Sequence, residues 1–466
     1  MLGKSTRMSK NLAVIGLGKL GASMAAAMAQ RGHQVIAVDV RPASVEAVNA
    51  GRAPVQETDL EATIRACGPR LRATTSHREA VLASDISFVV VPTPSDERGA
   101  FSLQYAAWAF HEIGRALAER KEYHLVVLCS TVLPGSTRFG LLPILEEQSG
   151  KKCGRDFGLC YSPEFIALGS VIRDFLNPDF CLVGEFDERS GRMLEECYRD
   201  VQLNKPPCQR MSLENAELAK LAVNTYVTTK ITFANMLAEL CERIPGGDVD
   251  VVTRALGLDK RIGARYLSGG LGYGGPCFPR DNVALGFLAR TLGSKAELAE
   301  TTDHFNRQFA GRVAERLKPL IAPGATVAVL GLAYKPFSHV VEESQGMQLV
   351  TALSKTGSRV VAYDPLAGAQ ARAELKDRAV IFDSMPECLA QADVVIIATP
   401  DPAFRALTAA DLLAGGRKKE ITVMDFWRVL PPAVTQHAGI RYIAFGRAES
   451  DTNAAMLADL WARPTH

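Results

Sequence analysis

Short runs of apolar residues, each bounded by turn-forming residues, recur along the first part of the chain. The runs that read as strands are 12–18, 34–40, 84–94, 124–131 and 179–185. Helical patterns lie between several of them. Because continuous apolar strands alternate with helices, this stretch predicts a doubly wound parallel sheet, with helices on both faces.

A second alternating stretch begins after Pro323 and Gly324. Its expected strands are 326–334, 359–365, 392–400 and 421–426. The first two of these repeat the pattern of the first two strands of the earlier stretch. The predicted fold class is therefore α/β, with two Rossmann-like doubly wound parallel-sheet domains.

Between the two stretches the hydrophobic spacing becomes helical. From Leu213 to about Arg243 there is neither proline nor glycine, and a helix of that length spans about 45 Å. Two shorter helical patterns follow, at 248–257 and 281–292. The expected division is a disordered lead-in at 1–10, a Rossmann-like domain at 11–210, a helical central domain at 211–322 and a second Rossmann-like domain at 323–466.

Composition is that of a soluble globular enzyme. Of the 466 residues, 47% are hydrophobic and 22% are charged, and the net charge of +2 is spread over intermixed acids and bases. We therefore expect no nucleic-acid surface. The 10 cysteines form no CxxC pair and no Cys/His spacing, so neither a metal site nor a disulfide framework is expected. No signal-type or membrane-spanning apolar run is visible, and a cytoplasmic location without membrane attachment is expected.

A glycine motif follows the first strand directly and opens the first helix. Its spacing, Gly16-x-Gly18-x-x-Gly21, permits a tight turn and lets the backbone approach a pyrophosphate. Asp39 ends the second strand, where a carboxylate accepts hydrogen bonds from ribose hydroxyls and repels a 2′-phosphate. NAD is thus favoured over NADP. The alternative is that Asp39 merely ends its strand and caps the next turn.

The corresponding turn of the second stretch is Gly331-Leu332-Ala333-Tyr334-Lys335. It lacks the later glycines, so it is poorly suited to hold another dinucleotide. Lys335 could meet a phosphate as a point charge, or could equally be a solvated turn lysine.

The run Leu271–Asn282, LGYGGPCFPRDN, is the most informative in the chain. Cys277 follows a glycine-rich turn, and Asp281 stands four residues later near the start of a predicted helix. A cysteine at a helix N-terminus has a lowered pKa and more thiolate, which is the nucleophilic form. Taken alone, a glycine-rich turn with an inert cysteine is the better interpretation.

Lys220 and Asn224 stand one turn apart on the long predicted helix and share one face. A lysine and an amide aimed at one point could stabilise a developing oxyanion. From spacing alone, an exposed lysine and a packing asparagine are favoured instead.

Two further motifs follow apolar strands, at the sheet edge where ligands bind in such folds. One is Ser130-Thr131-Val132-Leu133-Pro134-Gly135, and the other is Ser162-Pro163-Glu164-Phe165. Glu164 is a candidate general base. Its alternative is a loop carboxylate satisfied by backbone amides.

Together these motifs resemble the UDP-glucose/GDP-mannose dehydrogenase family over nearly the whole chain, from about residue 11 to about residue 447. The pieces that carry the resemblance occur in family order, and the cysteine loop is the most specific of them. They are GLGKLG, VPTP, STVLPG, SPEF, ELAKLAVN, DKRIG, GYGGPCFPRD, GLAYKP, AYDP and AFGR.

The resemblance implies a four-electron oxidation of the C6 alcohol of a nucleotide-sugar with two NAD. Cys277 is then the nucleophile that attacks the aldehyde, and a second hydride transfer gives a thioester that water opens. Lys220 and Asn224 are expected to stabilise oxyanions, and Asp281 and Glu164, with Thr131 close by, to order and activate water.

The resemblance also implies the ligand contacts. Expected cofactor residues are Gly16, Gly18, Lys19, Leu20, Gly21, Asp39, Thr93, Pro94 and Thr131. Expected substrate residues are Glu164, Phe165, Lys220, Asn224, Arg261, Tyr273, Gly274, Arg280 and Lys335. Arg261 is expected to reach the sugar nucleotide from a second subunit of a homodimer formed through the helical middle.

The chain departs from the family pattern at several places. Leu168 replaces a second glutamate, Glu342 replaces an arginine, and the late motif reads Asp425-Phe426-Trp427-Arg428. UDP-glucose is the favoured substrate, and GDP-mannose or another nucleotide-linked hexose or hexosamine is the alternative. Two other hypotheses are a two-electron dehydrogenase of the 6-phosphogluconate or hydroxyisobutyrate type and a catalytically impaired sugar-nucleotide or NAD-binding protein.

Overall fold

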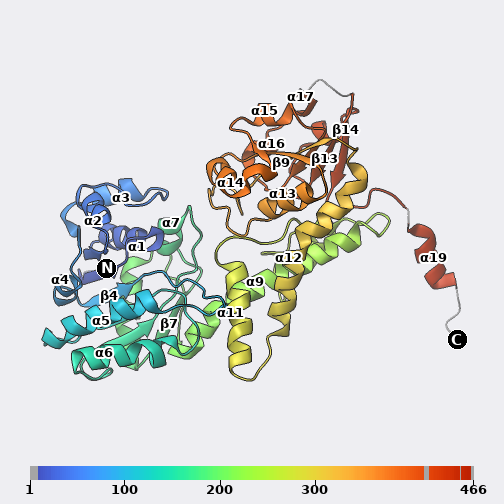
Figure 1. Cartoon of the computed structure of the whole chain (residues 1–466). Coiled ribbons are helices and arrows are strands. Elements are labelled where there is room, and N and C mark those ends of the chain that lie inside the picture. Colours follow the sequence, from blue (N-terminus) through green and yellow to red (C-terminus); the bar gives the residue numbers. More distant parts are fainter. Residues whose placement is uncertain (1–8, 414–418, 452, 463–466) are drawn as a thin grey trace, which may run out of the picture. The chain divides into compact units, whose positions relative to one another are not determined.

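The structure is a computed structural model that describes residues 9–413, 419–451 and 453–462 (Figure 1). The expected disordered lead-in at 1–10 therefore falls almost wholly outside the described residues. The chain divides into two compact units, Met1–Ala222 and Val223–His466.

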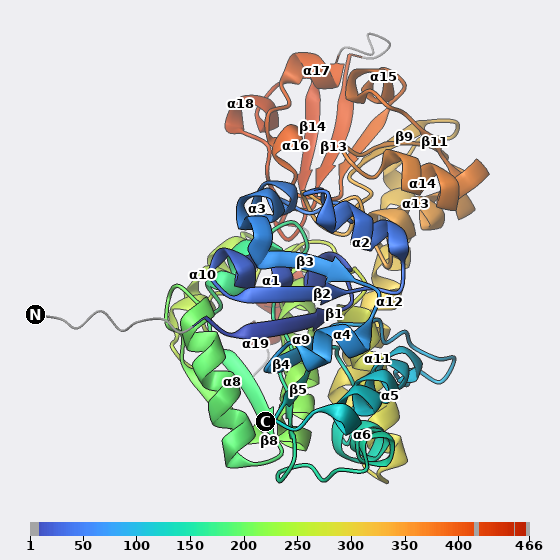
Figure 2. The same ribbon diagram turned by 90° about the vertical axis from the view of Figure 1, so that its left-hand side faces the viewer.

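The first unit holds an eight-stranded sheet in the order β3-β2-β1-β4-β5-β6-β7-β8 (Figure 2). The strands are β1 Asn11–Ile15, β2 Gln34–Val38, β3 Leu71–Thr74, β4 Ile86–Val89, β5 Leu125–Leu128, β6 Gly158–Tyr161, β7 Cys181–Glu185 and β8 Cys208–Ser212. All neighbouring strands run parallel except β6 and β7, which are antiparallel. The topological switch, where the order reverses, lies between β1 and β4.

Alternate residues of β1 feed two hydrophobic cores on opposite faces of this sheet. Leu12 and Val14 pack in one core with the alanine-rich helix α1, whereas Ala13 and Ile15 pack in the other with α5. The helices and turns of the unit are α1 Lys19–Gln30, α2 Pro42–Asn49, α3 Leu60–Cys67, η1 Gly68–Arg70, α4 His77–Leu82, α5 Gln104–Glu119, η2 Ser136–Leu141, α6 Leu142–Ser149, α7 Val171–Leu176 and α8 Glu188–Val201. The sheet is thus doubly wound, as predicted.

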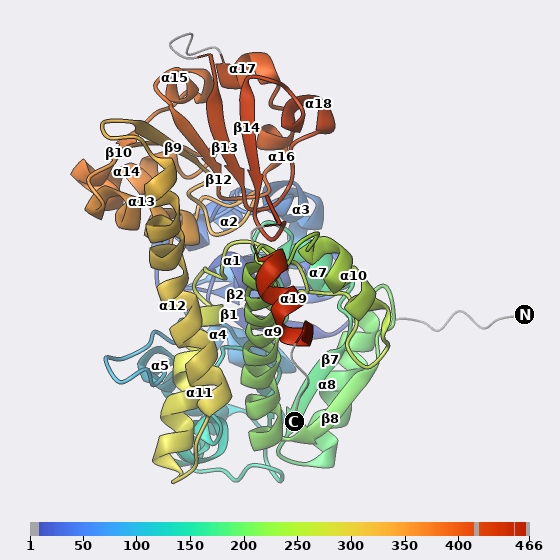
Figure 3. The same ribbon diagram turned by 90° about the vertical axis from the view of Figure 1, so that its right-hand side faces the viewer.

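Helix α9, Leu213–Cys241, follows β8 directly and is 29 residues long (Figures 1 and 3). This confirms the long helix predicted at 213–243. The other helices before the second sheet are α10 Val249–Leu258, α11 Phe278–Thr291, α12 Glu297–Leu317 and η3 Lys318–Leu320. The shorter patterns at 248–257 and 281–292 correspond to α10 and α11.

The second unit holds a six-stranded, wholly parallel sheet in the order β11-β10-β9-β12-β13-β14. Its strands are β9 Thr326–Leu330, β10 Arg359–Tyr363, β11 Val380–Ile381, β12 Val394–Ile397, β13 Ile421–Asp425 and β14 Ile440–Ala444. Its remaining helices are α13 Gln345–Lys355, α14 Gly368–Leu375, η4 Lys376–Arg378, α15 Met385–Leu389, α16 Pro402–Arg405, α17 Ala409–Leu413, α18 Pro432–Thr435 and α19 Ala454–Ala462. The predicted fold class is confirmed.

The repetition seen in the sequence extends to individual hydrogen bonds. In the first sheet the Leu17 amide donates to Asp39 Oδ2 over 2.8 Å, and in the second the Leu332 amide donates to Asp364 Oδ2 over 2.7 Å. Each carboxylate ends the second strand of its sheet and fixes the turn after the first strand.

Within the described part of the chain no helix is long and apolar enough to cross a membrane. The described residues also contain no group of three or more His, Cys, Asp or Glu side chains that could hold a metal ion.

Candidate functional site

The glycine loop after β1 has the shape that a dinucleotide requires. Gly16 has φ +105°, and a Cβ there would lie 2.1 Å from the Val90 carbonyl oxygen. A Cβ at Gly21 would lie 1.9 Å from the Gly16 carbonyl oxygen. In contrast, a Cβ at Gly18 would meet no described atom within 4 Å, and Gly18 is the N-cap of α1. The backbone is therefore open to a pyrophosphate where the helix dipole favours negative charge, so the residues fit NAD.

Asp39 is only 7% exposed, and its carboxylate accepts hydrogen bonds from two backbone amides of the protein. Its Oδ2 accepts the Leu17 amide, and its Oδ1 accepts the backbone N–H of Arg41 over 2.9 Å. Asp39 therefore does cap the turn that follows its strand, as the alternative interpretation expected. Each carboxylate oxygen can accept a further hydrogen bond, so the contact with the ribose hydroxyls stays a prediction. Lys19 and Leu20 lie on the first turn of α1, both half-buried.

The motifs after β4 and β5 are joined to each other. The Thr93 hydroxyl donates to the Thr131 carbonyl over 2.7 Å, and the Ser130 hydroxyl donates to the Val91 carbonyl over the same distance. Pro94 follows Thr93 in the same loop. Because β4 and β5 are adjacent parallel strands, both loops lie at the carboxyl edge of the sheet beside the switch point, where ligands bind in this fold.

Lys220 of α9 is bound to the loop that follows β6. Its Nζ donates to the Glu164 carbonyl over 2.7 Å and lies 4.3 Å from the centre of the Phe165 ring. The lysine is only 8% exposed. The structure therefore brings together Glu164, Phe165 and Lys220, and it corrects the interpretation of Lys220 as an exposed lysine.

The pKa of the Glu164 carboxyl lies near neutrality, which suits a catalytic acid or base. Desolvation raises its pKa to about 7, against the opposing effects of the Lys220 charge and a hydrogen bond with Tyr198. The Tyr198 hydroxyl lies 3.4 Å from Glu164 Oε1 and donates to the Ser162 hydroxyl over 2.8 Å. A carboxylate with a pKa near neutrality can both take up and release a proton at physiological pH.

Two residues that contact these motifs of the first unit were not predicted from the sequence. Tyr198 lies on α8, and no pattern around it indicates a partner. Glu217 of α9 is fully buried and accepts the Gly135 and Thr137 amides over 2.6 and 2.8 Å, so it ties the loop after β5 to the helix. Its burial raises its pKa. An acid three residues before Lys220 on an apolar helix face was the available signal.

Cys277 is the N-cap of α11, and its carbonyl accepts the Asp281 amide over 2.9 Å. All ten cysteines lie in the described part of the chain, and Cys277 alone is exposed. A thiol at this position meets the positive end of the helix dipole, which favours the thiolate. The predicted placement at a helix start is confirmed.

The glycines before Cys277 are required by close packing. Gly275 has φ +83°, and a Cβ there would lie 2.6 Å from the Tyr334 ring. A Cβ at Gly274 would lie 2.4 Å from the Glu343 carbonyl oxygen. The cysteine loop therefore lies against the turn that carries Lys335, whose Nζ is 5.7 Å from the Tyr334 ring centre. Burial, and secondarily the nearby Cys277, raises the pKa of Tyr334 to about 12.

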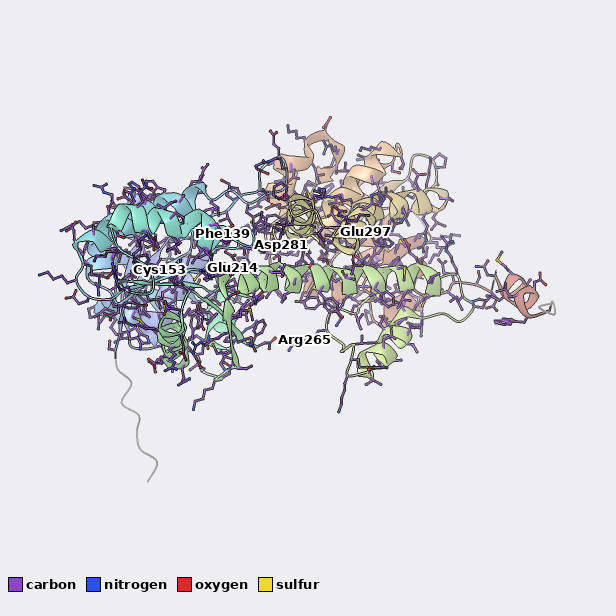
Figure 4. All side chains as sticks on the ribbon, turned by 90° about the horizontal axis from the view of Figure 1, so that it is seen from below. Phe139, Cys153, Glu214, Arg265, Asp281 and Glu297 are labelled. Carbon is purple, nitrogen blue, oxygen red and sulfur yellow. The ribbon has the colours of Figure 1, made fainter. Side chains whose placement is uncertain are left out.

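Asp281 and Asn224 are direct partners. Asn224 Nδ2 donates to Asp281 Oδ2 over 2.6 Å. Asp281, which is labelled in Figure 4, is 1% exposed. Arg280 Nε lies 3.5 Å from Asp281 Oδ1. Asn224 is thus not merely a packing residue, because it supplies the amide that a buried carboxylate requires.

Tyr273 is buried, and its backbone is clamped by side chains that the sequence did not single out. Its amide donates to Asn306 Oδ1 over 2.9 Å, and its carbonyl accepts Asn306 Nδ2 over 2.9 Å and Gln345 Nε2 over 3.3 Å. Its hydroxyl accepts Asn282 Nδ2 over 3.3 Å. These bonds fix the start of the cysteine loop, and contact of Tyr273 with a ligand stays a prediction.

Arg261 and Arg428 have different surroundings. The Arg261 side chain is 88% exposed and pairs with Asp259 over 2.6 Å. Arg428, from the late motif that departs from the family, pairs with Asp250 and donates to the Gly269 carbonyl, both over 2.8 Å. Arg428 is therefore a structural clamp, whereas the contact of Arg261 with a second subunit stays a prediction.

Comparison with known proteins identifies the chain. Three models of the UDP-glucose/GDP-mannose dehydrogenase family match it, the NAD binding domain at 10–202, the central domain at 214–308 and the UDP binding domain at 328–432. The chain is 37% identical over 400 residues to a UDP-glucose 6-dehydrogenase of Haloferax volcanii, covering 85% of this chain and 92% of the relative. It is 32% identical over 429 residues to a GDP-mannose 6-dehydrogenase of Pseudomonas putida, covering 89% and 96%.

A solved structure agrees with these matches. A UDP-glucose dehydrogenase from the archaeon Pyrobaculum islandicum superimposes with a TM-score of 0.84 at 34% identity, covering 96% of this chain and 100% of that one. Membership of one family therefore explains the glycine loop, the cysteine loop and the two sheets together. The chain belongs to the UDP-glucose/GDP-mannose dehydrogenase family and is an NAD-dependent nucleotide-sugar 6-dehydrogenase.

Proposed function

We propose that this enzyme oxidises the C6 alcohol of UDP-glucose to a carboxylate through a thioester on Cys277. The observation that carries the proposal is the position of Cys277, an exposed thiol at the N-terminus of an intact helix behind a glycine turn. UDP-glucose is favoured because the relative with 37% identity is a UDP-glucose 6-dehydrogenase, against 32% for that of Pseudomonas putida, which acts on GDP-mannose.

The atoms balance over two oxidations. NAD, when bound, supplies the hydride acceptor for each of them. The alcohol loses a proton and a hydride to give an aldehyde, and the Cys277 sulfur adds to the carbonyl carbon as a proton reaches the oxygen. Loss of a second hydride and a proton gives the thioester. Water then adds, the C–S bond breaks, and the carboxylate leaves, with one proton of the water returned to the sulfur and the other released.

The other residues receive roles that suit their surroundings. Lys220 and Asn224 are proposed to stabilise the negative oxygen that develops at C6, because an ammonium and an amide donate to oxyanions. Glu164 is proposed as the base, since its pKa of about 7 lets it take a proton from water or alcohol near neutral pH. Asp281 is proposed to orient the hydrolytic water.

GDP-mannose is a second candidate substrate with specific support. GDP-mannose 6-dehydrogenases of Pseudomonas putida and Azotobacter vinelandii are 32% and 33% identical to this chain over 429 and 431 residues. Those values lie close enough to 37% that overall identity alone does not choose between the bases.

The test is turnover with defined sugars. Purified enzyme and NAD are incubated in turn with UDP-glucose, GDP-mannose and a UDP-N-acetylhexosamine, with NADH followed by absorbance and the product by mass. Two NADH per uronate from UDP-glucose are expected, lost in Cys277→Ser and retained in Cys153→Ser, a half-buried cysteine outside the loop (Figure 4). One NADH with an aldehyde or keto product, unchanged by Cys277→Ser, would contradict the mechanism.

We further propose that the enzyme is a homodimer formed through α9 and the turn that follows it. Six large apolar side chains are exposed there, and five of them follow one another at intervals of three, four or seven residues: Tyr226, Phe233, Met236, Leu240 and Ile244. Such spacing places them in one stripe along a helix, which is the pattern of a helix–helix interface. An exposed apolar stripe of this length indicates a partner surface, and a second copy offers the same stripe.

The oligomeric state is measured by light scattering after size exclusion. The wild type is expected at twice the mass of one chain, and a double substitution Phe233→Glu with Leu240→Glu at one chain mass. Leu292→Glu is the matched control, because Leu292 is 71% exposed at the end of α11, outside the stripe. A monomeric wild type, or a double variant that stays dimeric, rejects the interface.

A further inference from the structure

Asp39 is accompanied by an arginine at the adenosine end of the coenzyme site. Arg41 is the N-cap of α2, and its backbone N–H and Nε both donate to Asp39 Oδ1, over 2.9 and 3.2 Å. The other carboxylate oxygen accepts the Leu17 amide. Both oxygens of the acid are thus engaged by the protein, and its negative charge faces a guanidinium.

The two terminal nitrogens of the Arg41 guanidinium can still bind a ligand. The side chain is 60% exposed, and among the described residues neither of its terminal nitrogens makes a hydrogen bond. Four N–H donors of a planar, permanently charged group therefore project beside the carboxylate that faces the ribose hydroxyls in this fold.

A second polar residue follows the neighbouring strand. β2 and β3 are parallel, with Val38 opposite Thr74, and the Asp39 amide donates to the Thr74 carbonyl over 3.3 Å. Thr75, the next residue, is exposed. The nearby acid Glu79 is already paired with Arg72. The ends of these two strands therefore offer a cation and a hydroxyl, with Asp39 as the opposing charge.

An unaccompanied carboxylate at the end of the second strand excludes a 2′-phosphate, whereas an arginine there binds one through paired N–H···O bonds. We propose that Arg41 makes this coenzyme site accept a 2′-phosphate, so that NADP binds alongside NAD. The inference concerns the coenzyme only and is independent of which sugar is oxidised.

The test is direct binding of two coenzyme fragments by isothermal titration calorimetry. ADP-ribose and 2′-phospho-ADP-ribose are titrated into the full-length enzyme without sugar. The wild-type dissociation constants are expected to lie within about 10-fold of each other. Arg41→Ala is expected to weaken the phosphorylated fragment about 10- to 100-fold, the size of one or two charged hydrogen bonds, and ADP-ribose by less than about 3-fold.

Two further variants make the result specific. Arg41→Lys keeps the positive charge but lacks the paired N–H donors of the guanidinium. Its dissociation constant for the phosphorylated fragment is expected to lie between those of wild type and Arg41→Ala. Arg52→Ala removes an exposed arginine beyond the other end of α2 and is expected to change neither constant. The proposal is overturned if wild type binds the phosphorylated fragment more than about 10-fold more weakly than ADP-ribose, or if Arg41→Ala weakens both fragments equally. Because no sugar is present, failure with UDP-glucose cannot be mistaken for failure here.

Discussion

The ammonium group of Lys220 donates a 2.7 Å hydrogen bond to the backbone carbonyl of Glu164. The helix α9 therefore holds the loop after β6 through a charged group that is almost fully buried and that also lies over the Phe165 ring. The same lysine lowers the pKa of Glu164, opposing the rise caused by desolvation. One residue thus sets both the position of the proposed base and its proton affinity.

Replacing Lys220 by methionine keeps the stem and removes the charge. We expect kcat to fall about 10²- to 10³-fold, the usual cost of one oxyanion donor. The melting temperature should fall as well, because the Glu164 carbonyl loses its charged donor. Initial rates and thermal unfolding measure both effects.

A structural role alone would lower the melting temperature of Lys220→Met and leave the rate per folded molecule unchanged. Leu218→Met is the matched control, because Leu218 is an exposed residue of the same helix. It is expected to alter neither quantity.

The rate should depend on pH through Glu164. Its pKa is raised to about 7, chiefly by desolvation, and a base acts only when ionised. We therefore expect kcat/KM to rise with pH up to about 7 and then level off. Tyr198→Phe removes a hydrogen bond that lowers this pKa, so the midpoint should move to higher pH. A midpoint that stays in place would show that Tyr198 does not act on Glu164.

The contribution of Glu164 to the stability of the folded protein should change with pH in the opposite direction to the rate. The pKa of Glu164 is higher in the folded chain than its ordinary value of 4.5, so the folded state binds more protons between those two values. The contribution of Glu164 to stability therefore falls as pH rises from about 4.5 to about 7. Glu164→Gln should remove that fall. The melting temperature of the variant relative to that of wild type should therefore rise as the pH increases across this range. A constant difference between the two proteins would contradict the raised pKa.

The sequence predicted the interior strands of both sheets except β6, and it missed the four strands at the edges, β3, β8, β11 and β14. β1, β2, β4 and β5 are continuous apolar runs because both of their faces are covered. β3 and β8 are edge strands that include exposed polar residues, so they carry no such run. β7 was predicted as a strand of a parallel sheet, yet it pairs antiparallel with β6, a direction that hydrophobicity does not encode.

For the site, residues inside a contiguous motif could be predicted, and residues defined only by a tertiary partner could not. Cys277 and Asp281 stand in one sequence motif, which predicted their position at the start of a helix. Glu217, Tyr198 and Asn306 act through partners 82, 34 and 33 residues away. An acid on an apolar helix face was a local signal for Glu217, but nothing local distinguishes Tyr198 and Asn306 from ordinary helix residues, because their role depends on which segment the fold brings to them.

Breaking the Asn224–Asp281 pair should be costly. Asn224→Ala leaves the buried Asp281 carboxylate without its 2.6 Å donor, and losing such a bond to a charged group costs about 1.5–3 kcal/mol. We expect a lower melting temperature that the double variant Asn224→Ala with Asp281→Ala partly restores. If the double variant loses as much stability as the two single variants added together, or more, the pairing is not the source of the loss.

The ten cysteines should differ sharply in reactivity. Desolvation raises the thiol pKa of Cys153, Cys181, Cys197 and Cys388 to about 12 and that of Cys208 to about 11, so these thiols hold almost no thiolate near neutral pH. Cys277 is exposed at a helix N-terminus. Brief treatment with iodoacetamide at pH 7, followed by peptide mass spectrometry, should therefore label Cys277 first, with activity lost in proportion to labelling. Nucleotide-sugar should slow both processes together. Early labelling at another cysteine, or full activity after Cys277 is alkylated, would be incompatible with a catalytic thiolate there.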